Sequence, residues 1–271
     1  MAEKDAEKAR MYCERGNSFY FGKERQANYR EALKWYREAV AFGSAEAMFM
    51  IGTMHTEGKG MEKSDKRAVK WMARAAENGY APAMRVLGNL HFHGVEVEYN
   101  RSKAAELYRQ AAELGDGDAM FALSCSLSSG EGVDQNDEES LEWLRKAVDA
   151  GCAPAMTVLA EMYRYSIRVE QSDSESLALY HRASDSGDSN ASVALAEMYL
   201  EGSAVDRSPK KALALLEDAA DNGNSDAMYM LAGMYLRGDS LEMSEEKGKE
   251  WMAKAAEAGN PMAQAAMVRL K

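Results

Sequence analysis

Small and apolar residues return along the chain with a fixed period. Glycine occurs at seven positions spaced 36 residues apart, namely Gly43, Gly79, Gly115, Gly151, Gly187, Gly223 and Gly259. Alanine follows the same register, four residues after and four residues before each of these glycines, as at Ala47 and Ala39. Because small side chains in phase mark places where helices cross closely, this period predicts a tandem repeat of helices.

Each 36-residue unit divides into two helices. With positions counted from the residue after the unit glycine, apolar residues at positions 4, 5, 8, 11 and 12 form one stripe with helical spacing. Position 21 is Ser or Asn in every unit and predicts the cap of a second helix. The unit glycine suits the left-handed residue that closes this helix. A further glycine at position 15 marks the turn between the helices, with Ser166 as the exception.

A single helix pair of this kind cannot bury its own apolar stripe, so the pairs must stack on one another. We therefore predict an all-α fold, a right-handed solenoid that forms a single domain over residues 1–271. Its seven repeats are 8–43, 44–79, 80–115, 116–151, 152–187, 188–223 and 224–259, followed by a capping helix over 260–271.

The segment "AMYMLAGMYLRG" (Ala227 to Gly238), followed by "GKEWMAKAAEAG" (Gly248 to Gly259), resembles the Sel1-like repeat branch of the tetratricopeptide superfamily. The resemblance extends over nearly the whole chain and rests on seven in-phase copies. It implies a scaffold or adaptor of the kind found in bacterial and eukaryotic systems, with no common active site. It also implies that the first helix of each pair lines a concave face.

The overall composition restricts the partners of this chain. Its net charge is -11, and we identify no basic run or aromatic-basic ribbon, so we expect no nucleic-acid partner. No apolar run reaches about 18 residues and no leader is visible, which predicts a cytoplasmic protein without a membrane partner. Cys13, Cys125 and Cys152 are far apart in sequence and are predicted to be free thiols.

Aromatic and apolar side chains occupy positions 3, 6, 10, 13 and 14 of the first helices, which the implied geometry places on the concave face. Exposed aromatic residues on one wall are typical of binding surfaces. We predict that a partner protein or peptide binds there, at Tyr20, Phe21, Phe49, Arg85, Phe92, His93, Phe121, Arg164, Tyr165, Glu197, Leu200, Tyr229 and Leu236. The alternative is that the aromatic rings pack sideways against neighbouring first helices.

The histidines do not predict a metal site. His55 and His91 share position 12, where later units have tyrosine, so we expect partly buried rings with a hydrogen bond. His93 lies two residues beyond His91 and points away from it on a helix. No recognised catalytic motif is present, and we predict no catalytic residue, metal or cofactor.

Three functions fit this sequence. The first is a non-enzymatic adaptor that binds a protein or peptide on its concave face. The second is an immunity or chaperone-like protein that sequesters a toxin or secreted effector, for which the acidic chain would suit a basic partner. The third is a hydrolase that uses His93 and carboxylates of the groove.

Overall fold

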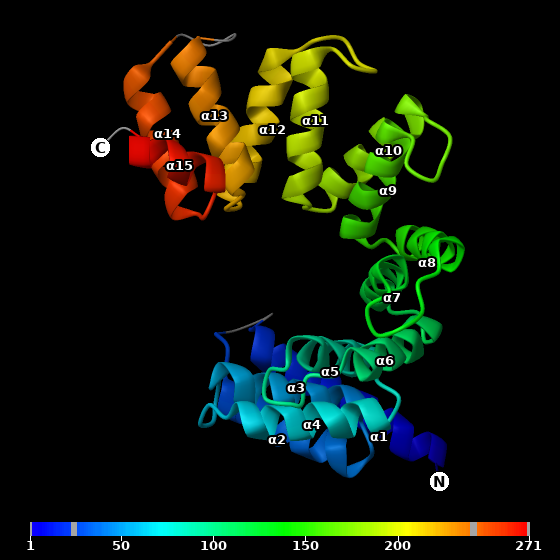
Figure 1. Cartoon of the computed structure of the whole chain (residues 1–271). Helices are drawn as coiled ribbons and strands as arrows, with labels where there is room; N and C mark the ends of the chain where they lie inside the picture. The colour runs from blue at the N-terminus through cyan, green and yellow to red at the C-terminus, as the bar shows by residue number, and fades with distance from the viewer. Residues whose placement is uncertain (1, 23–25, 239–242, 270–271) are drawn as a thin grey trace. The chain divides into compact units, whose positions relative to one another are not determined.

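The computed structural model describes residues 2–22, 26–238 and 243–269 (Figure 1). Fifteen helices and no strand occur in these ranges, which confirms the predicted all-α class. The chain divides into two compact units, Met1–Ala150 and Gly151–Lys271, here called unit 1 and unit 2. A single solenoid domain over the whole chain therefore stays a prediction.

Both units consist of consecutive helix pairs. Unit 1 contains α1 (Ala2–Phe21), α2 (Tyr29–Ala41), α3 (Ala45–Glu57), α4 (Asp65–Glu77), α5 (Ala81–His93), α6 (Arg101–Glu113), α7 (Gly117–Ser129) and α8 (Asp137–Asp149). Unit 2 contains α9 (Ala153–Tyr165), α10 (Asp173–Asp185), α11 (Ser189–Glu201), α12 (Pro209–Asp221), α13 (Ser225–Arg237), α14 (Glu245–Glu257) and α15 (Pro261–Arg269). Each first helix packs on its own second helix, and within a unit that second helix packs on the following pair.

The helix starts follow the predicted caps, with one exception. In α2 the Asn28 side chain accepts a hydrogen bond from the Glu31 backbone N–H at 3.1 Å, and Ser64 caps α4 in the same way. Ser208 stands before α12 without a side-chain capping bond, so the prediction of a working cap in every unit is wrong there. Pro209 follows it at the first helical position, where proline fixes the backbone angle that the helix start needs.

The turn between the two helices contains a second left-handed residue that the sequence pattern did not reveal. Position 15 has positive φ as expected, including Ser166 at 56°. Position 17 also has positive φ, and glycine provides it in only some units: φ is 74° at Gly60 but 61° at Ala204. An ordinary side chain is strained in this conformation, so the turn geometry is imposed by the helices that it joins.

Replacing Ala204 by glycine should therefore stabilise unit 2. Relief of the left-handed conformation gives about 1–2 kcal/mol, and the greater freedom of glycine in the unfolded chain offsets about 0.4–1 kcal/mol of it. Urea unfolding should thus show a gain of up to about 1 kcal/mol. The reverse change, Gly132→Ala, is the matched comparison. It should destabilise the protein because a Cβ there would lie 2.1 Å from the Arg101 carbonyl oxygen.

The core of each pair depends on a small residue at position 9 of the first helix, which faces the residue at position 29 on the second. Gly88 lies directly under the ring of Tyr108, where an added Cβ would be 2.7 Å from the ring. Gly16 has the same relation to Tyr36. Each tyrosine hydroxyl continues past the glycine and donates to an asparagine of the first helix, Tyr108 to Asn89 at 2.7 Å. Backbone and ring thus approach as closely as their atoms allow.

This contact predicts a compensating pair of substitutions. Gly88→Ala should overpack the crossing and lower the free energy of unfolding by roughly 1–3 kcal/mol. The double variant Gly88→Ala/Tyr108→Leu should be more stable than the sum of the two single changes, because Ala196 and Leu216 are the natural occupants of these positions in unit 2. Additive effects in a double-mutant cycle would show that the crossing does not decide the packing.

Candidate functional site

The predicted binding residues occupy positions 3, 6, 10, 13 and 14 of the first helices, and these positions together are here called the first-helix wall. In unit 1 it runs over α1, α3, α5 and α7, and in unit 2 over α9, α11 and α13. Hydrogen bonds join successive first helices directly: Asn17 Nδ2 of α1 donates to Glu46 Oε1 of α3 at 2.9 Å. Each unit has its own wall.

The residue at position 6 contacts the first residue of the next repeat. Arg85 Nε lies 3.0 Å from Asp116 Oδ1, and the same guanidinium reaches Asp118 at 3.4 Å. Phe49 makes the apolar version of this contact, with its ring centroid 5.3 Å from that of Tyr80. For Phe49 the alternative of sideways packing is therefore correct, and Arg85 is engaged within the protein.

Arg164 is the corresponding charged link in unit 2. Its guanidinium lies 3.5 Å from Glu197 and 3.0 Å from Glu201, both on the following first helix. Only 11% of the Arg164 side chain is exposed. The predicted pair Arg164 and Glu197 is thus a contact between repeats, and a partner could reach mainly the two carboxylates, which are 41% and 58% exposed.

Tyr20 is not an exposed anchor, and this expectation is wrong. Its side chain is 7% exposed, and its ring packs against Tyr29 and Tyr36. The hydroxyl donates to the carboxylate of Glu57. Burial, followed by this bond, raises the pKa of Tyr20 to about 12. Tyr29 and Tyr36 belong to the second helix of the first pair, and their rings cover Tyr20 and bury it.

The exposed members of the predicted set gather near the C-terminal ends of the first helices. Phe21 and Tyr165, at position 14, are 60% and 59% exposed, and Leu236 is 37% exposed. His93, also at position 14, is exposed with its ring edge-on to Phe92. The remaining aromatic and apolar members are half-buried, namely Phe92, Phe121, Leu200 and Tyr229. Position 14 is therefore where the wall offers aromatic surface to a partner.

The histidines at position 12 have the predicted structural role. His91 Nδ1 lies 2.9 Å from the carbonyl oxygen of Glu98, and His55 makes the equivalent contact with Glu62 at 3.4 Å. Both bonds tie the turn to the first helix. Among the described residues, His93 forms no ion pair with a carboxylate, and no group of three His, Cys, Asp or Glu side chains could hold a metal ion.

The cysteines are free thiols, as predicted. Cys13 is buried at 1% exposure, whereas Cys125 is exposed. Burial followed by the charge of Glu46 raises the pKa of the Cys13 thiol to about 12. Cys13 is therefore a core residue without thiolate reactivity at neutral pH.

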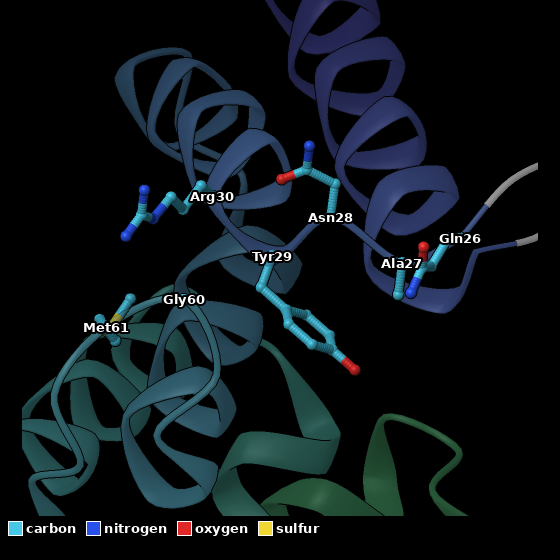
Figure 2. Close-up of a pocket in the computed structure, with 7 residues that line it drawn as sticks. All are labelled: Gln26, Ala27, Asn28, Tyr29, Arg30, Gly60 and Met61. Atoms are coloured by element: carbon cyan, nitrogen blue, oxygen red, sulfur yellow. The ribbon is translucent and has the colours of Figure 1, made fainter.

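Figure 2 shows a hollow where the start of α2 meets the turn between α3 and α4. Its lining consists of Gln26, Ala27, Asn28, Tyr29, Arg30, Gly60 and Met61. The side chains of Tyr29 and Arg30 leave α2 in different directions (Figure 2). This lining contains no carboxylate, histidine or thiol, so its residue types do not form a catalytic group.

Glu161 on α9 is a carboxyl of the first-helix wall whose pKa is raised. Burial raises its pKa above the ordinary value, and the negative charges of Asp188 and Glu197 raise it further, while Arg164 acts in the opposite sense. A carboxyl whose pKa is raised on folding contributes stability below its unfolded pKa. That contribution is lost as pH rises through the folded pKa. Ionisation of Glu161 therefore lowers the stability of unit 2.

Glu161→Gln should accordingly stabilise the protein at pH 7, by less than about 1 kcal/mol because solvent screens the exposed part of the carboxyl. The gain should shrink as the pH falls through the raised pKa of Glu161, where its carboxyl takes up a proton. Thermal unfolding at several pH values measures this. Glu217→Gln, on the exposed surface of α12, is the control, and an equal gain there would contradict the stated cause.

No helix in the described ranges combines the length and the apolar character that crossing a membrane requires.

Comparison with known proteins identifies the repeat. The model of the Sel1 repeat matches eight stretches of the chain, 1–18, 16–41, 45–80, 81–116, 117–152, 153–188, 189–224 and 225–260. The first of these overlaps α1, which has 20 residues, whereas α3 has 13. No curated protein matches the sequence.

Several solved structures share the fold. A Sel1 repeat protein from Oxalobacter formigenes is 28% identical, with 91% of this chain and 99% of that chain covered and a TM-score of 0.80. The protective antigen c5321 of uropathogenic Escherichia coli, which displays an SLR fold, is 31% identical with a TM-score of 0.68. The match covers 97% of this chain but spans only 56% of c5321. The immunity protein PA5088 from Pseudomonas aeruginosa is 21% identical with a TM-score of 0.58, and the match covers 81% of this chain and 83% of PA5088. At this identity the likeness shows the fold alone.

Proposed function

Because the chain belongs to the Sel1 repeat family, we propose that it is a non-catalytic adaptor whose first-helix wall binds a partner protein or peptide. Proteins of this family generally mediate protein–protein interactions. The proposal includes a cytoplasmic location, where the three thiols would remain reduced. It includes no cofactor. It also includes no nucleic-acid partner, since the chain is strongly acidic.

The observation that carries the proposal is the exposed aromatic edge of the wall. Phe21 and Tyr165 are more than half exposed, although aromatic side chains of this size gain most from burial. Carboxylates lie beside them on the wall, Glu57 next to α1 in unit 1 and Glu201 next to α9 in unit 2. A partner that covers a ring and pairs with these carboxylates would be amphipathic and basic.

Site-specific photo-crosslinking in cells of the source organism tests this proposal. A photoreactive phenylalanine analogue is placed at Phe21 or at Tyr165, and at the exposed Ala178 and Ala214 of second helices as controls. We expect the wall positions to capture the same discrete protein, which mass spectrometry identifies, and the controls to capture none of it. Capture of the same protein at all four positions, or none at the wall, would refute the proposal.

Binding by the purified pair then measures the contribution of the edge. The double variant Phe21→Ser/Tyr165→Ser should bind the captured partner roughly tenfold or more weakly, since aromatic anchors of interfaces contribute about 1–2 kcal/mol each. The thermal unfolding midpoint should hardly change, because both rings are exposed. Phe49 and Phe92 are less suitable targets, because they pack against the core of unit 1 and their loss would also destabilise it.

A second candidate function is that of an immunity or chaperone-like protein that sequesters a toxin or secreted effector. Two observations favour it: the acidic chain, and the fold shared with proteins named as immunity proteins, a likeness that by itself shows only the fold. The two functions differ in the identity of the crosslinked protein. Capture of a basic toxin, and loss of viability when the present protein is depleted in a toxin-producing strain, would favour sequestration over adaptor work.

A further inference from the structure

The outer face of α4 carries a stripe of side chains unlike that of the other second helices. Arg67, Lys70, Trp71 and Arg74 follow one another at the spacing that places residues on one side of a helix, and together they line a shallow hollow. The three cationic residues are exposed. Trp71 is half-buried, and one side of its indole packs against the core. The exposed part of the indole lies between the three cationic side chains.

The cations of this stripe have no carboxylate partners among the described residues, and the Arg74 guanidinium lies over the Trp71 ring, 4.6 Å from its centroid. By contrast, two cations at the equivalent positions of other second helices are paired, Lys34 with Glu31 and Lys103 with Glu106. Like charges three and four residues apart on a helix repel one another. The stripe therefore does not stabilise α4 by itself.

Equivalent positions on the other second helices that carry tryptophan show how unusual this stripe is. Each of these helices has at least one acidic residue at the three positions, whereas all three are basic on α4: the residues are Glu31, Lys34 and Glu38 on α2, Glu139, Glu142 and Lys146 on α8, and Lys247, Glu250 and Lys254 on α14. Residues 59–74 hold six Lys or Arg and two acidic residues, within a chain whose net charge is -11. The expectation that the sequence contains no aromatic-basic ribbon is wrong at this helix.

We propose that the outer face of α4 is a second docking surface, which binds an acidic segment of a partner protein. The stripe extends over eight residues, Arg67 to Arg74, or about 10 Å of helix, which is room for two or three carboxylates of one segment. The flat, half-buried indole would take an aromatic or aliphatic side chain between them. Charge complementarity favours this occupant, because the first-helix wall of the same unit is acidic and would repel it.

Fluorescence anisotropy with the full chain tests the proposal, independently of any partner of the wall. The probe is a fluorescein-labelled decapeptide of glutamates with one central tyrosine, at low ionic strength. We expect saturable binding that the triple change Arg67→Glu, Lys70→Glu and Arg74→Glu weakens roughly tenfold or more, since three ion pairs are lost. Added salt should weaken the wild-type complex.

The matched control places the same three charge reversals at the equivalent positions of other second helices: Lys103→Glu, Lys34→Glu and Lys146→Glu. It has the same net charge as the stripe variant, and its affinity should stay within about twofold of wild type when binding is local. Trp71→Leu keeps the charges and inserts the residue that occupies this position at Leu107, so it should fold and still bind more weakly.

Several outcomes would overturn the proposal. One is an equal loss of affinity in the control and the stripe variants, which would make the binding a property of net charge alone. Absence of saturable binding by the wild type is another. Duplex DNA or phosphatidylserine vesicles that bind through the same three residues more tightly than the peptide would assign the stripe to a different class of ligand.

Discussion

The close crossing of the two helices in each repeat is the contact on which the rest of the structure depends. Position 9 of the first helix is Gly, Ala or Ser, and position 29 of the second helix fills the space that the small residue leaves. Tyr36 and Tyr180 are almost completely buried there. At the crossing of α7 and α8, Ser124 and Ser140 instead exchange hydrogen bonds with each other's backbone carbonyl oxygens, both at 2.8 Å. The helix separation stays small although the chemistry of the crossing changes, and this separation aligns the first helices into a wall.

The wall combines two kinds of side chain that the sequence does not distinguish. Some of them are used in contacts with the following repeat, as Arg85 at position 6 is with Asp116 and Arg164 at position 13 is with Glu197. Position 14 lies beyond the reach of the next helix, so Phe21 and Tyr165 stay exposed. The surface available for a partner is therefore narrower than the list of wall residues, and more aromatic at its edge than at its centre.

Unit 1 presents opposite charge on two helix layers. Its first-helix wall contains Glu46, Glu57 and Asp118, whereas α4 carries three exposed cations around Trp71. An adaptor with two such surfaces could hold a basic and an acidic partner at the same time, and neither would compete for the site of the other. This arrangement requires no catalytic residue, since each surface acts through burial of aromatic rings and charge complementarity alone.

The sequence by itself determined the repeat, its helix pairs, most of the helix caps and the family. These features depend on local spacing: a glycine that closes a helix, a Ser or Asn that caps one, and an apolar stripe of helical period act within one turn of the chain. The hydrogen-bonded role of His91 was also predictable, because tyrosine takes the same position in other units.

Only the tertiary structure decided which wall residues are accessible, and where charge is left unpaired. Tyr20 is buried because two tyrosines of α2 approach it from outside its own helix, and Arg85 is paired with a carboxylate 31 residues away. The sequence shows that α4 is rich in basic residues, but it does not show that these residues lack carboxylate partners. Exposure and pairing depend on the neighbours of a side chain across repeats, and no period along the chain contains that information.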